Sequence, residues 1–446
     1  MKSAATAVST IVALALFGAL YVGAKTVISV DDVQSIRVDL DLSHVARRVD
    51  ERFLSVAIDA SLIAEERFMN LLNSPTLRTL AKALVPAFLR FGGTKQDFMT
   101  FNPRGRYFQA RDNSSSAVLG NLCHLRLELP PLLENRLKQE WVLQSKTLLQ
   151  EELEGKYKKT KFSGKFNFTS FKLLPNGEFI ASYLCIELVL VFLLYSYYVN
   201  GRDTSLHDFL DPEVLDTLAT KINEVLEIVE SVSPGKKVWL GETSSAYGGG
   251  AVGLSDTFVA GFMWLDKLGL AAKLGLDVVI RQVLIGSGTY HLVDDNLDPL
   301  PDYWLSLLYK RLVGPEVLKA EVNMNSRPKK PIRVYLHCTN RKSTHYRPGA
   351  VTLFALNLNK NEVTIILPDH MANSTIEAFV LQSAEAGEQS LYSRSVKLNG
   401  QVLRMVDDRT LPPLKGRELP PGEHIKLPGF SFAFYVLIEA QALVCK

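Results

Sequence analysis

The stretch Val238-Trp-Leu-Gly-Glu-Thr-Ser-Ser-Ala-Tyr-Gly-Gly-Gly250 is the most informative part of the sequence. It begins with an apolar run that predicts a buried strand, so Glu242 stands where a strand opens into a glycine-rich loop. In a (β/α)8 barrel, catalytic residues lie at the carboxyl ends of the strands. A carboxylate there is suited to nucleophilic attack, and the amides of Gly248, Gly249 and Gly250 can approach an anionic substrate. The alternative is a strand-to-helix turn with a solvated Glu.

Length, composition and charge bound the class of protein. The chain has 446 residues, 47% of them hydrophobic, which is enough for one or more large cores. Its net charge of +3 argues against a nucleic-acid binder. Residues 1–24 hold Lys2, an apolar run and then Gly23 and Ala24, the order of a secretory signal peptide. A membrane anchor is the alternative, although the apolar run is short for a span.

Secretion agrees with two other features. Three triplets of the type Asn-x-Ser/Thr are acceptors for N-glycosylation, at Asn113, Asn167 and Asn373. Four cysteines can form disulfides in an oxidising compartment, namely Cys123, Cys185, Cys338 and Cys445. Four cysteines allow three sets of pairs, and their spacing does not choose among them. Their spacing is also not that of metal ligands, so no metal site is expected.

Residues 25–112 predict the first part of a barrel. The expected elements are strands at 33–42 and 53–60, a helix at 72–84 and a strand at 87–94. This β-α-β order favours a parallel barrel, and its first strand could also join a sandwich. Residues 113–165 contain Pro130, Pro131 and a charge-dense run, which indicates an exposed and removable insertion.

Two patterns follow in the second half. Residues 199–319 are expected to complete the barrel, with helices at 211–232, 255–274 (amphipathic) and 304–312 and a strand at 276–283. From residue 320 the hydrophobic period becomes two, with strands expected at 332–337, 351–358, 363–367, 396–405 and 430–438. Asn399-Gly400 is a hairpin turn signal. Residues 320–446 are therefore predicted to form a β-sandwich.

Five motifs of the sequence are distinctive when taken together. They are Phe53-Leu-Ser-Val-Ala-Ile-Asp59, Leu89-Arg-Phe-Gly-Gly-Thr-Lys95, the stretch 238–250, Tyr290-His-Leu-Val-Asp294 and Leu300-Pro-Asp-Tyr-Trp-Leu305. This set resembles the heparanase family. The resemblance implies a (β/α)8 barrel with a C-terminal β-sandwich. It implies a secreted retaining endo-β-glucuronidase that cleaves heparan sulfate in lysosomes and extracellular matrix without a cofactor. It also implies excision of the segment 113–165, which would leave two associated subunits.

The resemblance assigns roles to residues. Glu242 aligns with the nucleophile. The positions that hold the sugar carboxylate align with Tyr247, Gly248, Gly249, Gly288 and Tyr290, and other cleft positions align with Asp59, Thr94 and Gln282. Ser61 stands where an Asn is expected. Cys338 and Cys445 bracket the β-sandwich as the family's disulfide does, and the pairing of Cys123 and Cys185 stays open.

The proton donor of the family is not found in this chain. A retaining glycosidase needs two carboxyl groups about 5–5.5 Å apart, one to attack the sugar and one to protonate the leaving oxygen. The family carries the second in an Asn-Glu-Pro motif after the fourth barrel strand, and this sequence contains no Asn-Glu-Pro. Space is also short, since a full barrel takes about 250 residues and strands three to five are not recognisable. We therefore expect an incomplete barrel.

An atypical apolar tract, residues 166–198, occupies the gap. Its part 179–198 has one charge, Glu187, and is long enough to span or contact a membrane. The favoured interpretation is a segment introduced by alternative splicing or an imperfect gene model, because a central Glu is unfavourable in a bilayer. Glu187 could replace the missing acid only if the fold brought it opposite Glu242.

Two functions remain open from the sequence. The first is hydrolysis of heparan sulfate with Glu242 as nucleophile, and the second is a secreted, inactive protein that binds heparan sulfate or heparin. Clustered cations bind sulfated glycans, and the best run of them contains Arg327, Lys329, Lys330 and Arg333. A solvated turn is the alternative for that run. His291 and His337 are interpreted as structural, and a chain that does not fold stably is a further alternative.

Overall fold

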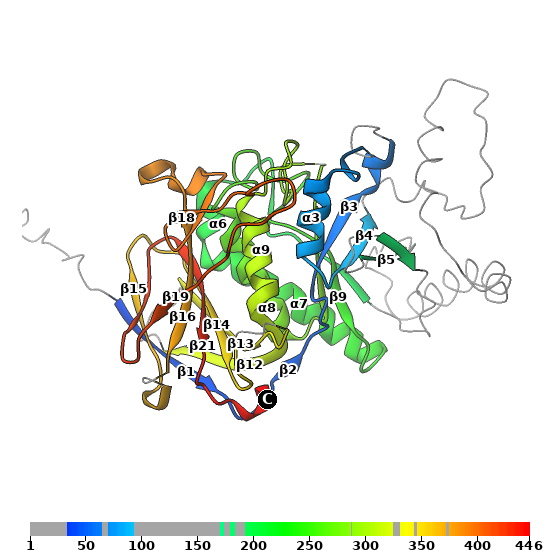
Figure 1. Cartoon of the computed structure of the whole chain (residues 1–446). Coiled ribbons are helices and arrows are strands. Elements are labelled where there is room, and N and C mark those ends of the chain that lie inside the picture. Colours follow the sequence, from blue (N-terminus) through cyan, green and yellow to red (C-terminus); the bar gives the residue numbers. More distant parts are fainter. Residues whose placement is uncertain are drawn as a thin grey trace, which may run out of the picture.

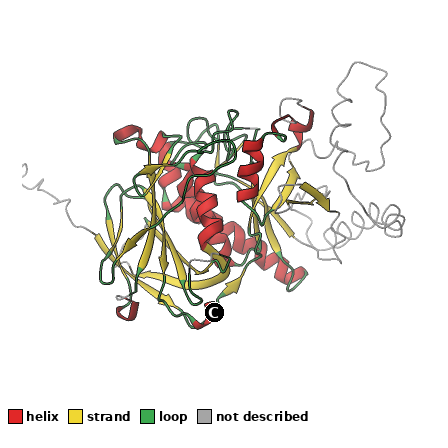
Figure 2. Cartoon of the chain, viewed as in Figure 1, coloured by secondary structure: helices red, strands yellow, loops and turns green. Residues whose placement is uncertain are grey.

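The computed structural model describes residues 34–64, 70–92, 170–173, 179–182, 192–286, 288–323, 331–342, 346–371 and 374–446. Strands gather at two ends of the molecule, and the long helices lie between them (Figures 1 and 2). One end is a seven-stranded sheet of the α/β part, and the other is a β-sandwich whose strands are hydrogen-bonded into one twelve-stranded sheet. The predicted combination of a barrel-type α/β part and a C-terminal β-sandwich is confirmed.

The α/β sheet has the strand order β6-β5-β4-β3-β11-β9-β7. Its strands are β3 (Leu54–Asp59), β4 (Phe88–Gly92), β5 (Ser170–Leu173), β6 (Phe179–Ser182), β7 (Phe192–Tyr195), β9 (Val238–Thr243) and β11 (Val278–Arg281). The pairs β4–β3, β3–β11, β11–β9 and β9–β7 are parallel, whereas β5 and β6 add antiparallel pairs. Because β3, the first parallel strand, pairs with β11, the last one, the sheet curls round as in a barrel.

Helices follow the parallel strands, and the last of them leads into the sandwich. They are α3 (Pro75–Ala83), α6 (Leu206–Leu210), α7 (Pro212–Val232), α8 (Ala260–Leu274) and α9 (Pro301–Leu312). α7 begins where Asp211 accepts a hydrogen bond from the amide of Glu213 at 2.9 Å and where Pro212 can occupy the first turn without losing a bond. The short pair β8 (Val199–Asn200) and β10 (Ala246–Tyr247) lies beyond the ends of β7 and β9.

Helix α8 is buried on all sides, so the expectation of an amphipathic helix at 255–274 was wrong. Thirteen of its fifteen residues are buried, Asp266 and Lys267 among them. Two glycines let it approach the sandwich closely, since a Cβ at Gly261 would lie 2.5 Å from the ring of Phe432 and one at Gly269 would lie 2.3 Å from the ring of Tyr335. A helix that is covered all round needs no polar face, which explains the continuous apolar pattern.

The β-sandwich contains the remaining strands. They are β1 (Gln34–Asp41), β2 (Arg47–Arg48), β12 (Val313–Asn323), β13 (Ile332–Thr339), β14 (Val351–Asn357), β15 (Val363–Ile366), β16 (Ile376–Ser383), β17 (Val396–Leu398), β18 (Gln401–Val402), β19 (Arg417–Leu419), β20 (Ile425–Leu427) and β21 (Ser431–Leu437). Short 3₁₀ helices are η1 (Ala60–Ala64), η3 (Asp369–Met371), η4 (Gly387–Tyr392) and η5 (Leu443–Cys445). β1 pairs with β12 and β15, so the N-terminal strand lies in this domain.

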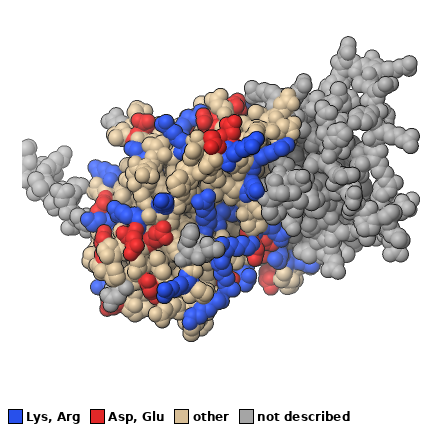
Figure 3. Space-filling model, viewed as in Figure 1, with Lys and Arg blue, Asp and Glu red and all other residues tan. Residues whose placement is uncertain are grey.

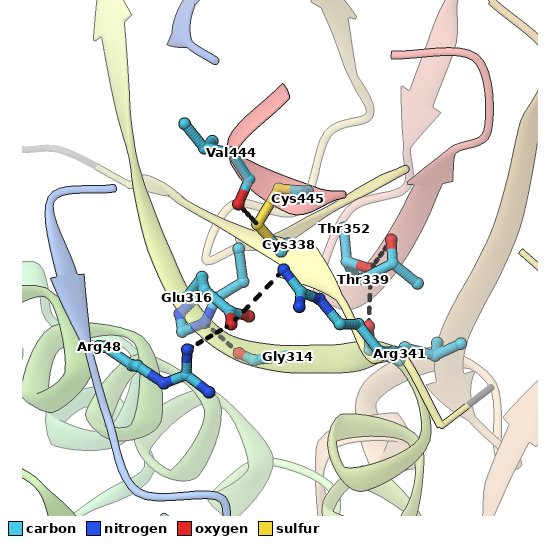
Figure 4. Close-up of a disulfide and its surroundings, with 11 residues drawn as sticks. Arg48, Gly314, Glu316, Cys338, Thr339, Arg341, Thr352, Val444 and Cys445 are labelled. Carbon is cyan, nitrogen blue, oxygen red and sulfur yellow. Dashed lines mark hydrogen bonds and ion pairs between the residues drawn. A yellow bond between two sulfur atoms is a disulfide. The ribbon is translucent and has the colours of Figure 1, made fainter. Parts of the chain in front are cut away.

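A disulfide ties the last residues of the chain to the sandwich (Figure 4). Cys338 on β13 is bonded to Cys445 in η5, the pair that the resemblance implied. Nearby, Glu316 of β12 is buried and forms ion pairs with Arg48 at 3.1 Å and Arg341 at 3.9 Å. These contacts join β2, β12 and the turn after β13 below the disulfide.

Two features of the chain differ from the expectation. Residues 192–195, inside the tract expected to be an atypical insertion, form β7 and pair with β9, while residues 183–191 of that tract lie outside the described ones. The sandwich also begins earlier than residue 320, because β12 starts at Val313. Among the helices that the structure describes, none has both the length and the apolar character needed to cross a membrane.

Candidate active site

Polar side chains meet at the carboxyl ends of the parallel strands. Asp59 ends β3, Arg90 lies in β4, Glu242 lies one residue before the end of β9, and Gln282 follows β11. Tyr197 comes two residues after β7. Since parallel strands bring their carboxyl ends to one edge, residues more than 200 positions apart in the sequence become neighbours.

Glu242 is held by two donors. The guanidinium of Arg90 donates to Oε2 of Glu242 at 2.8 Å, and the hydroxyl of Tyr197 donates to Oε1 at 3.0 Å. The side chain of Glu242 is 19% exposed, whereas that of Arg90 is 5% exposed. Burial and the nearby carboxylate of Glu242 raise the pKa of Tyr197, so this hydroxyl stays protonated and keeps donating. The carboxylate is therefore oriented by two donors and partly open to solvent.

Arg90 is itself fixed by its surroundings. Its guanidinium lies 5.4 Å from the centre of the Tyr195 ring and donates to the Tyr195 hydroxyl at 3.5 Å. A Cβ at Gly92 would lie 2.2 Å from this guanidinium, so a larger residue there would displace the guanidinium from its place beside Glu242. Gly92 thus leaves room for the cation that pairs with Glu242.

Asp59 forms a second cluster beside Glu242. Its Oδ1 accepts hydrogen bonds from the amide and the hydroxyl of Ser61 at 2.9 and 2.7 Å, and its Oδ2 accepts one from Nε2 of Gln282 at 3.2 Å. Ser61, which stands where an Asn was expected, therefore orients Asp59. The side-chain oxygen Oε1 of Gln282 is buried without a hydrogen-bond partner among the described residues. A sugar hydroxyl is a suitable donor for it.

Tyr290 faces Glu242 from the loop after β11. Its ring stacks on that of Tyr197 with 6.2 Å between the ring centres, and its carbonyl accepts a hydrogen bond from Arg281 at 2.9 Å. Arg281 is in turn paired with Asp302 at 2.6 Å in the interior. Burial, followed by the charge of Glu242, raises the pKa of Tyr290 to about 12, so its hydroxyl is neutral.

The glycine-rich loop packs against the loop that carries Tyr290. Thr289 donates its amide to the carbonyl of Gly249 at 2.7 Å, and a Cβ at Gly288 would lie 2.4 Å from that same oxygen. Gly248, Gly249 and Gly288 all have positive φ, the region that favours glycine. Tyr247 is 51% exposed beside them. Two glycine segments 40 residues apart thus form one surface next to Glu242.

The structure brings most of the sequence-predicted site residues together and leaves others undescribed. Glu242, Asp59, Tyr247, Gly248, Gly249, Gln282, Gly288 and Tyr290 lie at this edge of the sheet. Outside the described residues are Thr94, Arg327, Lys329, Lys330, Asn113, Asn167, Asn373, Cys123, Cys185 and Glu187. Within the described part, no group of three His, Cys, Asp or Glu side chains has the arrangement of a metal site.

Arg333 requires a correction, because the structure turns it inward. It is 8% exposed, pairs with Asp216 of α7 at 2.6 Å and donates to the carbonyl of Pro212 at 2.9 Å. Its charge thus links the barrel to the sandwich and is not presented to a glycan. The sequence reasoning also missed Arg90, Tyr195 and Tyr197. The Arg-Phe-Gly-Gly motif was the available signal for Arg90. It places a cation near the end of the strand that follows the one ending in Asp59.

Comparison with known proteins gives the family. Residues 187–269, which include Glu242, match Glycosyl hydrolase family 79, N-terminal domain. Heparanase of Bos taurus is 38% identical, with 89% of this chain and 90% of the relative covered, and heparanase of Gallus gallus is 39% identical, with 92% and 97% covered. Inactive heparanase-2 of Homo sapiens is 30% identical, with 92% and 90% covered.

A solved structure supports the fold. The 4-O-alpha-L-rhamnosyl-beta-D-glucuronidase of Fusarium oxysporum superposes with a TM-score of 0.56 at 15% identity, with 90% of this chain and 100% of that chain covered. The sequence relatives, together with the strand-end carboxylate and its two donors, assign the molecule to a family. The chain belongs to the heparanase family of glycosyl hydrolases.

Proposed function

We propose that this chain binds heparan sulfate at the strand-end site and that Glu242 is the nucleophile of a retaining glycosidase that lacks its proton donor. The observation that carries the proposal is the carboxylate of Glu242, fixed by Arg90 at 2.8 Å and Tyr197 at 3.0 Å at the carboxyl end of β9. Each donor holds one of the two carboxylate oxygens in place, as an oriented nucleophile requires.

The neighbouring groups suit a glucuronide. The amides of the glycine-rich loop and the neutral hydroxyl of Tyr290 can donate to the sugar carboxylate, and Gln282 can accept from a sugar hydroxyl. In the first step an oxygen of Glu242 forms a bond to the anomeric carbon. The bond from that carbon to the leaving oxygen breaks, and its electron pair departs with the leaving group. With a sugar as leaving group, that oxygen also needs a proton.

The proton donor is the missing part. The sequence contains no Asn-Glu-Pro, and Asp59 accepts three hydrogen bonds, which hold it between Ser61 and Gln282. The alignment with the bovine relative has 496 positions but uses 89% of the 446 residues, about 400, so about 100 positions have no residue here. Loss of general acid–base help typically slows a reaction by about 10²- to 10⁴-fold. We therefore expect slow or absent cleavage of heparan sulfate.

A substrate that needs no proton tests the nucleophile. In 2,4-dinitrophenyl 2-deoxy-2-fluoro-β-D-glucuronide the dinitrophenolate leaves unprotonated, and the fluorine slows hydrolysis of the glycosyl-enzyme. We expect one dinitrophenolate per chain and a mass adduct on the peptide that contains Glu242. The Glu242→Gln variant should give neither. Intact heparan sulfate should be cleaved about 10²- to 10⁴-fold more slowly than an aryl glucuronide without the fluorine. An unlabelled wild-type chain rejects this function.

The second candidate is a heparan sulfate-binding protein without catalysis, favoured by the missing Asn-Glu-Pro and by the likeness to inactive heparanase-2. Lys and Arg side chains form a band down the face shown in Figure 3, over α9 and toward β12. Retention on heparin that falls steeply with salt, with no fragment released and no labelling, supports this alternative. A chain that passes through heparin at moderate salt excludes it.

A further inference from the structure

Lys267 is a completely buried cation directly behind the nucleophile. It lies in the middle of α8 with none of its surface exposed. Moving an ammonium group from water into the interior costs several kcal/mol unless hydrogen bonds replace the water. Its contacts therefore show what the cation does in this position.

The ammonium group of Lys267 contacts the ends of two strands. It donates to the hydroxyl of Thr243 at 2.5 Å, to the carbonyl of Ser244 at 2.8 Å and to the carbonyl of Ser196 at 3.5 Å. Its nitrogen also lies 4.3 Å from the centre of the Tyr198 ring, a cation–π contact. Ser196 follows β7 directly, Thr243 is the last residue of β9 and Ser244 follows it, so one side chain bridges the two strand ends.

The three acceptors around Lys267 match the donors of an ammonium group. The hydroxyl of Thr243 donates its own hydrogen to the carbonyl of Ser196, so toward Lys267 it can only accept. Three oxygen acceptors then match the three hydrogens of an ammonium group, while a neutral amine supplies two. Burial lowers the pKa of Lys267, as do Arg281 of β11 and Lys221 of α7, and Asp266 on its own helix opposes them.

The residues bridged by Lys267 are the sequence neighbours of Glu242 and Tyr197. Thr243 follows Glu242 in the chain, and Ser196 precedes Tyr197, whose hydroxyl donates to Glu242. The amide of Ser196 also donates to the backbone carbonyl of Glu242 at 3.3 Å. The two strand ends are therefore joined both by this bond and by Lys267. A shift of one strand end relative to the other would therefore change the separation between the Tyr197 hydroxyl and the Glu242 carboxylate.

We propose that Lys267 is a positioning residue, which ties the ends of β7 and β9 and so fixes the carboxylate of Glu242 against the hydroxyl of Tyr197. This inference rests on the proposed function of Glu242. It assigns α8 a part in the chemistry besides packing, since the helix delivers a cation to the strand ends from behind. A misplacement of about 1 Å at a reacting group can cost about 10²-fold in rate.

The experiment measures labelling of the full chain by the dinitrophenyl 2-fluoroglucuronide, with the rate constant at saturation and the half-saturating concentration determined separately. In Lys267→Met, which keeps the length of the side chain and removes the cation, we expect the saturated rate to fall about 10- to 100-fold. The half-saturating concentration should stay within about twofold, because the sugar-binding groups are unchanged. Thr243→Val should lower the rate less, and Thr243→Ser, which keeps the hydroxyl, should restore most of it.

A matched control separates position from stability. Tyr335 donates to Asp266, the neighbour of Lys267 on α8, at 2.6 Å, and it is not among the hydrogen-bond partners of Lys267 at the strand ends. Tyr335→Phe should lower the melting temperature without lowering the labelling rate. If Lys267→Met labels at the wild-type rate, the inference is wrong.

A crystal structure of the Lys267→Met variant gives a second readout. If the wild-type chain is not labelled, the proposed function fails, and the variant structure alone decides the role of Lys267. An unchanged separation of about 3 Å between the Tyr197 hydroxyl and Glu242 in that structure also overturns the inference. If Lys267→Met does not fold, the Thr243→Val and Thr243→Ser pair answers the same question by rate and structure.

Discussion

The ion pair between Arg90 and Glu242 lies where little water can screen it. The side chain of Arg90 is 5% exposed and that of Glu242 is 19% exposed, with 2.8 Å between their nitrogen and oxygen. Removing one member leaves the other without its partner, which costs more than the pair contributes to stability. We expect Arg90→Met and Glu242→Gln each to lower the free energy of unfolding by about 2 to 4 kcal/mol. The double variant should lose less than the two single losses combined, as urea denaturation can measure.

A control for that pair lies at the opposite end of the sheet. Arg52 pairs with Asp50 at 2.8 Å, and its side chain is 39% exposed, so water screens it. Arg52→Met should change the free energy of unfolding by about 1 kcal/mol or less. Additive losses in the Arg90 and Glu242 double variant would show that the two groups do not interact.

Single residues also show how much of the site could be predicted from the sequence. Glu242 and the glycines after it were recognisable because a strand-end acid and its loop are continuous in the sequence. Arg90, Tyr197 and Lys267 were not, since each reaches Glu242 or its strand end from another element. Arg333 was assigned to the surface because a run of cations usually is, and only the fold shows Asp216 beside it. Contacts between distant elements are the part that the sequence pattern does not contain.

At the scale of elements, α8 makes the sharpest prediction. Alanine is a better helix former than glycine by about 1 kcal/mol, so Gly269→Ala would stabilise an exposed helix. Here its Cβ would lie 2.3 Å from the ring of Tyr335, and forced repacking costs about 1 to 3 kcal/mol. We expect a net loss of free energy of unfolding in urea denaturation. Thr220→Ala on the exposed side of α7 is the matched substitution and should be neutral or stabilising.

A melting temperature above that of wild type for Gly269→Ala would contradict the close approach of α8 to β13.

The burial of whole elements also explains an error of interpretation. Buried strands and helices in a parallel α/β fold lack a polar face, so their sequences are continuous apolar runs. The pattern therefore could not distinguish β7 from a membrane segment. In α8, Asp266 and Lys267 gave the pattern of an amphipathic helix, although both are buried. The alternating strands β13, β14 and β21 keep period two or lie between clear turns, and they were located within a few residues.

At the scale of the whole molecule, the barrel and the sandwich share one interior. The ring of His337 on β13 lies between Tyr309 of α9 and Phe354 of β14, with 6.4 and 5.7 Å between ring centres. Its Nδ1 faces the carbonyl of Gly314 at 2.8 Å, so this nitrogen carries the hydrogen. Its Nε2 is buried with no partner in the described part of the chain. A proton added there would place a charge at the junction of the two domains.

This arrangement predicts that acid weakens the junction. Burial lowers the pKa of His337 from 6.5 to about 4. The unfolded chain therefore takes up the proton first, so the stabilising contribution is complete above pH 6.5 and is lost as the pH falls toward 4. A shift of this size corresponds to about 3 kcal/mol. We expect the free energy of unfolding of wild type, measured in urea from pH 7 to pH 4, to decrease by about that much more than that of His337→Asn. The asparagine keeps a donor near Gly314 and cannot take up a proton, and His370→Asn, at an exposed histidine in η3, should follow wild type. Parallel pH profiles for wild type and His337→Asn would show that the buried imidazole is not what couples the stability of this two-domain interior to acid.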